Sequence, residues 1–301
     1  MLINKVKTMT AVTMHLGEIG QQLRAFRLES GMRADEIAAR LGVSRAALYR
    51  YEKGEVIKLD TVQRLAELLN ISPLTLLGVG FEYYSKPDSF FQKITQIEGD
   101  IEQILQVSDP VCYQVTSPAY DAVLLEAHTS QQVKEGGDVM EAPAILAQSK
   151  RRALYSQRKP SIISMLPEKQ IIDFLTHGVG AGIPMSETLR HKARQVAVQE
   201  IRNIITLIDS VPMGLQFSVI PKNITTTSCI FMRRNELMAV AINPFRCDSS
   251  AANTAGIAMI TSSPEAVATH QQMLETLWQT SLKGQEAIDR LKKLVEQHGA
   301  V

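Results

Sequence analysis

The stretch MRADEIAARLGVSRAALYRYEKG, residues 32–54, decides how the N-terminal part of this 301-residue chain folds. Ile37 and Leu41, four residues apart, mark the buried side of a short helix that is expected to stop at Gly42. Gly42 can adopt the positive φ of a tight turn, and Ser44 is a good N-cap for a second helix through Tyr51. The stretch therefore predicts two short helices joined by a tight turn.

Further short helices are predicted on both sides of this stretch. The apolar residues of segment 16–26 recur at three- and four-residue spacing, as on one face of an amphipathic helix. Asp60 is expected to cap a fourth helix, and Ser72 with Pro73 places a cap and a helix-starting proline before a final turn. Five short helices over residues 15–80 would form one compact all-α unit.

Residues 16–80 resemble the lambda-repressor-like, Cro/repressor-type helix-turn-helix domain of the XRE family of bacterial transcriptional regulators. The resemblance rests on the LGVS turn at 41–44, the YEKG segment at 51–54 and the sequence LDTVQRLAELLNIS at 59–72. It implies a five-helix domain that places its second motif helix in the major groove of double-stranded DNA. It also implies a cytoplasmic protein that regulates transcription as a repressor. One departure is Ala34, where the family usually has a glutamine that braces the backbone, so one phosphate anchor is missing.

Side chains on the outward face of the second motif helix are the predicted DNA contacts. A recognition helix must expose hydrogen-bonding groups near its N-terminal end, where they reach base edges. Arg45 is the best candidate for reading guanine O6 and N7, and Ala46 suits a thymine methyl group. The predicted contacts to bases or flanking phosphates are Arg45, Ala46, Tyr49 and Arg50, and the predicted phosphate contacts are Arg33, Ser44, Lys53 and Lys58. The alternative for each charged residue is an ordinary solvated helix face.

An apolar stripe within residues 81–109 is the predicted dimerisation element of a linker helix. Residues 15–80 carry a net charge of only +1, which indicates modest DNA affinity for one copy. Two copies on two half-sites about 34–36 Å apart are therefore expected. On a helix predicted from Pro87 to Val107, the stripe has the a/d spacing of a coiled coil; its residues are Phe90, Ile94, Ile97, Ile101 and Ile104. Packing of the stripe on its own domain is the alternative.

Residues 110–301 are predicted to form a second domain, of the α/β or α+β class. Short apolar runs predict strands at Leu215–Ile220, Cys229–Met232, Leu237–Ile242 and Gly256–Thr261, and longer patterns predict helices at Glu187–Ile208 and Glu265–Val295. We expect this domain to bind a small-molecule effector or to oligomerise, and so to modulate DNA binding.

No catalytic constellation can be assembled from the second domain, so we expect no enzyme activity, no metal and no cofactor. The segment HGVGAGIP at 177–184 is interpreted as a helix C-cap and turn, with a phosphate-binding loop as the alternative. Cys112, Cys229 and Cys247 are interpreted as buried small side chains, with a redox switch as the alternative. Two other functions stay open: a DNA-tethered enzyme, and an antitoxin or phage-type repressor that senses a protein partner.

The composition is that of an ordinary water-soluble protein, with 45% hydrophobic residues and 32 Lys and Arg residues against 31 Asp and Glu residues. No apolar run approaches about 18 residues, and the first 14 residues lack a secretory apolar core, so we expect a cytoplasmic protein with no membrane partner. The charges are segregated, with a net −8 over residues 81–145 and a net +6 over 146–202. We expect these segments to neutralise each other across an intramolecular or subunit interface. An anionic ligand on the basic segment is the alternative, bound by Lys150, Arg151, Arg152, Arg158 and Lys159.

Overall fold

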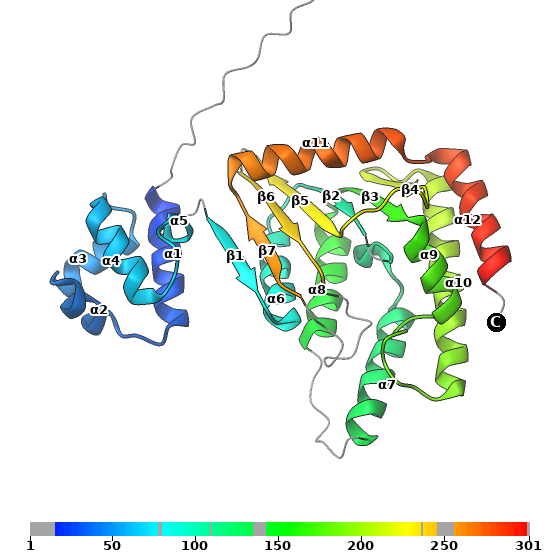
Figure 1. Ribbon diagram of the computed structural model, residues 1–301, viewed down its shortest axis with the longest axis horizontal. Coiled ribbons are helices and arrows are strands. Elements are labelled where there is room, and N and C mark those ends of the chain that lie inside the picture. Colours follow the sequence, from blue (N-terminus) through cyan, green and yellow to red (C-terminus); the bar gives the residue numbers. More distant parts are fainter. Residues whose placement is uncertain are drawn as a thin grey trace, which may run out of the picture. The chain divides into compact units, whose positions relative to one another are not determined.

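The computed structural model describes residues 16–77, 80–108, 110–134, 143–235, 237–245 and 256–299 (Figure 1). The chain divides into two compact units. The first, here named the helical domain, runs through Glu82 and includes Thr261–Glu265, and the second, the sheet domain, comprises Tyr83–Ile260 and Ala266–Val301. The prediction of a separate linker at 81–109 is wrong, because residues from Tyr83 onward belong to the sheet domain. Residues 1–14 and Cys247, on which two expectations rest, lie outside the described residues.

The described residues of the helical domain include five complete helices. They are α1 (Leu16–Glu29), α2 (Ala34–Leu41), α3 (Arg45–Glu52), α4 (Leu59–Leu69) and α5 (Pro73–Leu76). Gly42 ends α2 with a φ of 70°, and the Ser44 hydroxyl accepts a hydrogen bond of 3.1 Å from the Ala47 N–H, so the predicted turn and N-cap are confirmed. The predicted cap at Asp60 is wrong. Lys58 occupies the N-cap of α4, and Asp60 lies in the first turn, where its negative charge interacts favourably with the positive end of the helix dipole.

Each of the five helices buries at least one apolar side chain completely. Leu23, Ile37, Leu48, Leu65 and Leu76 all have an exposed fraction of 0% and belong to one core. Burying such side chains is the main source of stability in a small domain, and it also fixes how each helix is rotated about its axis. Because Leu48 points into the core, the opposite face of α3 is turned to solvent.

The sheet domain is built on a seven-stranded sheet with the order β1-β7-β6-β5-β2-β3-β4. Its strands are β1 (Phe81–Tyr84), β2 (Gln103–Val107), β3 (Ser161–Pro167), β4 (Leu215–Ile220), β5 (Cys229–Arg234), β6 (Leu237–Ile242) and β7 (Ala258–Thr261). Strands β2, β3 and β4 pair in parallel, whereas β5 pairs antiparallel with both β2 and β6. Helices connect the parallel strands, as a parallel crossover requires.

Helices cover the two faces of the sheet unequally. They are α6 (Pro87–Glu98), α7 (Pro118–Lys134), α8 (Pro143–Arg158), α9 (Glu168–His177), α10 (Glu187–Ser210), α11 (Pro264–Thr280) and α12 (Gly284–His298), with a short 3₁₀ helix at Tyr113–Val115. Six of these helices contribute to the larger core cluster on one face. Within the described part of the chain, α11 is the only helix in the cluster on the other face, where its Val267 and Leu274 pack with Met165 and Phe231. Figure 1 shows α11 running across the sheet from β6 toward β4.

Several elements of the sheet domain match their predictions. Strands β4 and β6 have the predicted bounds, and β5 and α10 begin at the predicted residues. The prediction of one helix over Glu265–Val295 is wrong, because α11 ends at Thr280 and a separate helix, α12, begins at Gly284. There Leu282 forms an isolated antiparallel bridge with Val219 of β4.

The predicted dimerisation stripe is buried inside the sheet domain. Helix α6 ends at Glu98 and residues 103–107 form β2, so the stripe is not one continuous helix. Phe90 and Ile94 are 0% exposed, and the remaining members, Ile97, Ile101 and Ile104, pack in or against the same core. The prediction of dimer contacts through this stripe is wrong, because its side chains already fill the core of their own domain.

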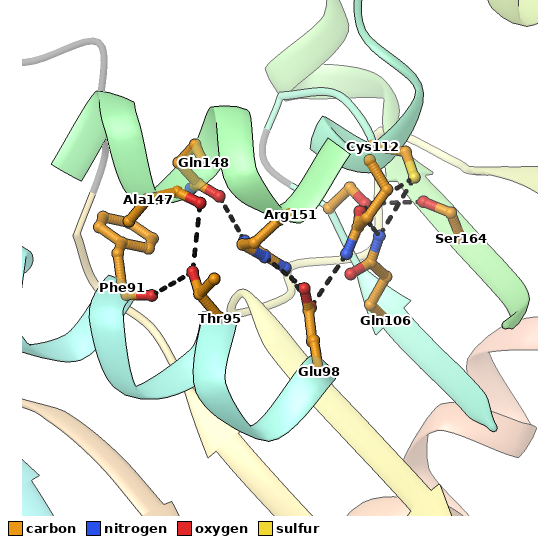
Figure 2. Close-up of polar contacts among 11 residues, drawn as sticks. Phe91, Thr95, Glu98, Gln106, Cys112, Ala147, Gln148, Arg151 and Ser164 are labelled. Atoms are coloured by element: carbon orange, nitrogen blue, oxygen red, sulfur yellow. Dashed lines mark hydrogen bonds and ion pairs between the residues drawn. The ribbon is translucent and has the colours of Figure 1, made fainter. Parts of the chain in front are cut away.

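Ion pairs join the acidic and basic segments within one chain. They are Arg151–Glu98, Arg152–Asp121, Arg158–Asp100 and Lys192–Glu126. Arg151 and Glu98 are buried, and Arg151 donates to both oxygens of Glu98 over 2.7 and 2.6 Å while Gln148 accepts a further bond from it (Figure 2). The interpretation that the two segments neutralise each other is confirmed. The ion pairs also favour neutralisation over an anion-binding site on the basic segment, since Arg151, Arg152 and Arg158 already have carboxylate partners.

The glycine-rich segment and two cysteines have structural roles. Gly178 ends α9 with a φ of 83°, and its N–H bonds the Phe174 carbonyl over 2.8 Å, which confirms the predicted C-cap and turn. Burial raises the pKa of both Cys112 and Cys229 to about 12, so these thiols stay protonated and unreactive at neutral pH.

Among the described residues, no helix is both long and apolar enough to span a membrane. No group of three or more His, Cys, Asp or Glu side chains in the same residues could hold a metal ion.

Candidate nucleic-acid interface

Helix α3 presents one face to the core and the opposite face to solvent. Leu48 is 0% and Ala47 9% exposed, and Tyr51 packs half-buried against the same core. The eight residues predicted to contact DNA are all exposed: Arg33, Ser44, Arg45, Ala46, Tyr49, Arg50, Lys53 and Lys58. Five of them carry a positive charge, so the surface has the chemistry that phosphate contacts need.

Arg45 and Tyr49 form a pair on the exposed face of α3. The Arg45 Nη2 donates to the Tyr49 hydroxyl over 3.1 Å, and the guanidinium carbon lies 5.4 Å from the centroid of the Tyr49 ring. This hydrogen bond raises the pKa of Arg45, which keeps the side chain charged. A guanidinium has five N–H donors, so the bond to Tyr49 leaves others for O6 and N7 of a guanine.

The remaining cations of this surface differ in their surroundings. Arg50 lies 3.5 Å from the carboxylate of Glu55, and Arg33 lies 3.7 Å from that of Asp35. Both pairs are exposed and therefore contribute little to stability, so a DNA phosphate can replace the carboxylate. Lys53 follows directly after α3 as its C-cap residue and is exposed.

A close backbone approach holds α1 against the C-terminal end of α3. A Cβ atom at Gly20 would lie 2.6 Å from the carbonyl oxygens of Tyr51 and Glu52 and 2.7 Å from the N atom of Gly54. Real Cβ atoms do not approach other atoms this closely, so only glycine fits at position 20 without moving α3.

An ion pair reinforces the same junction. The Arg27 Nε and Nη2 atoms donate to the two carboxylate oxygens of Glu52 over 2.6 and 3.2 Å. Only 11% of the Arg27 side chain and 6% of the Glu52 side chain are exposed, and the bonds to Glu52 raise the pKa of Arg27. This bidentate geometry orients as well as attracts, so α1 fixes the position from which α3 presents its outer face.

Sequence reasoning missed this support for α3. Its signal was present, because Arg27 follows Leu23 by four residues and Glu52 follows Leu48 by four. Each charged residue thus lies on the inward stripe of its helix, where an unpaired charge would be costly. Two opposite charges on the inward stripes of neighbouring helices indicate an ion pair between them.

Comparison with known proteins identifies the motif. Residues 23–76 match the family model HTH_3, helix-turn-helix. The chain is 37% identical over 81 residues to a "Putative HTH-type transcriptional regulatory protein" of Pyrococcus horikoshii, a match that covers 25% of this chain and 26% of that protein. A protein of the same description from Pyrococcus abyssi is 28% identical over 126 residues, which cover 40% of this chain and 38% of the relative.

These matches show a helix-turn-helix motif in a part of the chain. The matched region spans well under half the length of either curated relative. Among solved structures, that of TrmBL2, an archaeal chromatin protein, aligns at 11% sequence identity and a TM-score of 0.34. The alignment covers 74% of this chain and 61% of the TrmBL2 chain. Both curated relatives are archaeal, so the comparisons do not support the expectation of a bacterial protein.

Proposed function

We propose that this chain is a transcriptional regulator that binds double-stranded DNA in a sequence-specific way through α3. The observation that carries the proposal is the exposed basic face of α3, on which Arg45 and Tyr49 are already paired. This face belongs to a segment that matches the helix-turn-helix family. Helices of this motif contact base edges with side chains near their N-terminal ends, and Arg45 is the first residue of α3.

The exposed residues divide into two roles. Arg45 reads a guanine through O6 and N7, Ala46 contacts a thymine methyl group, and Tyr49 and Arg50 reach a neighbouring base or phosphate. Arg33, Ser44, Lys53 and Lys58 hold phosphates and so set the position of α3 in the groove without specifying sequence. Each phosphate contact steepens the dependence of log affinity on log salt concentration by about one unit.

The protein acts as a dimer on a two-fold-symmetric operator. The basic face of one copy is small, and one copy can cover only one half-site. Two copies related by a two-fold axis would place two α3 helices in successive major grooves, about 34–36 Å apart. Linking two half-site contacts raises the affinity for the whole operator without any new contact.

The sheet domain modulates DNA binding in response to a small-molecule effector. The protein acts in the cytoplasm, where it represses transcription by binding DNA rather than by catalysing a reaction. The sheet domain is a compact unit of its own, far larger than recognition by α3 requires. An effector that binds one conformation better needs to supply only about 1–3 kcal/mol of coupling to change DNA affinity by about 5–150-fold.

Selection of genomic DNA fragments by the purified full-length chain tests the proposal. Bound fragments are eluted and sequenced for the wild type, for Arg45→Ala and for Arg202→Ala, a control that removes the same charge from an exposed position of α10. The proposal expects a few sites that share a two-fold-symmetric motif with the wild type and the control, and loss of that motif with Arg45→Ala. Diffuse, salt-sensitive recovery without a motif for the wild type would contradict sequence-specific recognition by this chain.

A further inference from the structure

The turn that ends α3 ties Glu55 to Arg50 through the backbone. Lys53 is the C-cap of the helix, and Gly54 follows it with a φ of 92°. The Gly54 N–H donates to the Tyr51 carbonyl over 3.0 Å, and the Glu55 N–H donates to the Arg50 carbonyl over 3.1 Å. These are the two bonds of a Schellman motif, which brings the residue two positions after the C-cap next to the third-last residue of the helix. The geometry of the turn therefore places Glu55 beside Arg50.

A charge pair occupies the position at which this motif frequently has a hydrophobic contact. The Arg50 Nε atom lies 3.5 Å from the Glu55 Oε2 atom, and 61% of the Arg50 side chain and 54% of the Glu55 side chain are exposed. An ion pair this exposed contributes little to stability. The main effect of the Glu55 carboxylate is therefore on Arg50 itself, a residue that the proposed function brings to DNA.

The two arginines of α3 differ in what they must give up to bind DNA. Arg45 pairs with the neutral hydroxyl of Tyr49, so its positive charge stays available. Arg50 alone of the two forms an ion pair with a carboxylate in the described part of the chain. A DNA phosphate can bind the Arg50 guanidinium only by displacing the Glu55 carboxylate, which would then remain close to a negatively charged backbone.

The other carboxylate on this surface has a structural role of its own. Asp35 lies 3.7 Å from Arg33, but it also lies in the first turn of α2, where its charge interacts favourably with the helix dipole. Glu55 lies beyond the C-terminal end of α3, where a negative charge is not favoured by the dipole of that helix. Its carboxylate is thus held beside Arg50 by the turn and the ion pair alone.

We propose that Glu55 is a built-in competitor of DNA phosphates for Arg50, and that it lowers the affinity of α3 for DNA of any sequence. The inference rests on the proposed function for the docking of α3 on DNA. Phosphate contacts carry no sequence information, so weakening one of them makes stable binding depend more on the base contact of Arg45 and on the second half-site. Glu55 thereby limits occupancy of the about 10⁶–10⁹ competing sites of a genome.

The affinity of the full-length chain for a short duplex of random sequence, measured by fluorescence anisotropy at several salt concentrations, tests the inference. Glu55→Gln removes the charge and keeps both the side-chain length and the backbone bond of the turn. We expect about three- to tenfold tighter binding at low salt, and a dependence of log affinity on log salt that is steeper by about one unit. Glu67→Gln removes the same charge from an exposed position of α4 and should change the affinity far less.

A double-mutant cycle shows whether Glu55 acts through Arg50. In an Arg50→Gln background the carboxylate has no arginine to compete for, so Glu55→Gln should then change the affinity no more than Glu67→Gln does. Tighter binding that persists in full without Arg50 would overturn the inference. Unchanged or weaker binding by Glu55→Gln with Arg50 intact would overturn it too, and weaker binding would show that Glu55 instead orients Arg50 for its contact.

The random duplex keeps this test separate from that of the proposed function. A wild type that binds the duplex but selects no motif from genomic DNA would contradict sequence-specific recognition and leave the competition at Arg50 standing. A wild type that selects a motif, together with a Glu55→Gln variant that binds no tighter, would overturn only the competition. Circular dichroism of each variant confirms that the helices are intact before affinities are compared.

Discussion

Arg27 in α1 and Glu52 in the last turn of α3 lie 25 positions apart in sequence and form a bidentate ion pair that is largely shielded from solvent. The pair connects the helix that supports the domain to the helix that presents Arg45. Removing one partner would leave the other charge buried without compensation, which is far more costly than removing both.

We therefore expect Arg27→Met to destabilise the helical domain by about 3–5 kcal/mol. The double variant Arg27→Met with Glu52→Leu should recover much of this loss, since no charge then remains buried. Urea unfolding of the full-length chain, followed by a probe in the helical domain, measures both. A single variant as stable as the wild type would show that the pair does not hold α3 in place.

The glycine at position 20 gives a prediction of unusual sign. Replacing a glycine inside a helix with alanine ordinarily stabilises the helix by up to about 1 kcal/mol. At Gly20 the new methyl group would lie 2.6 Å from two carbonyl oxygens of the α3 end. We expect Gly20→Ala to destabilise the helical domain by on the order of 1–3 kcal/mol, whereas Gln21→Ala at the next, exposed position should change little. Thermal unfolding of the two variants decides between these signs.

Glu200 in α10 should make the stability of the sheet domain fall as pH rises. Burial raises the pKa of Glu200, although hydrogen bonds from the Ser117 N–H and hydroxyl oppose the shift. The folded chain therefore keeps this proton at pH values where the unfolded chain has lost it. The resulting loss of stability begins near the unfolded pKa of about 4.3 and grows until the folded pKa is passed.

Glu200→Gln removes this titration while keeping an oxygen for Ser117. As the pH rises from about 4 to about 7, the free energy of unfolding of this variant should therefore increase relative to that of the wild type. The increase should be no more than about 1.4 kcal/mol per pH unit. Denaturant titrations at several pH values measure the difference. A difference that stays constant over this range would contradict a raised pKa in the folded state.

The two described cysteines should be inert in the folded protein. With a pKa of about 12, Cys112 and Cys229 are thiolates in only about one molecule in 10,000 at pH 8. In a Cys247→Ser background, a disulfide reagent should therefore modify neither thiol until denaturant is added, after which both should react. Fast modification before unfolding would restore the redox-switch alternative.

The helical domain could be predicted well because its signals are local. Gly42 and Ser44 mark the turn, and apolar residues three or four apart mark the inward side of each helix. The same spacing placed Arg45 and Tyr49 on the outer face of α3, and both are exposed. In contrast, Arg27 and Glu52 meet through tertiary packing, which a local pattern does not report.

The sheet domain was harder to predict because its contacts are distant in sequence. Ile97, Ile101 and Ile104 continue a helical spacing into residues that form β2. Strand β2 pairs with β3, whose Ser161 opposes Gln103, and the two strands are separated in sequence by the helices α7 and α8. Tertiary pairing thus overrides the helical periodicity of this segment. The break between α11 and α12 likewise depends on a contact, the bridge from Leu282 to β4.

The most direct test of recognition through α3 measures the affinity of the full-length chain for its selected operator with each base pair replaced in turn. We expect Arg45→Ala to cost about 1–3 kcal/mol on the unaltered operator and to abolish discrimination at one base position of each half-site. Lys53→Ala should instead weaken binding to all sequences about equally and reduce the salt dependence by about one unit. If Arg45→Ala left both the affinity and the base preference unchanged, α3 would not be the element that reads the sequence.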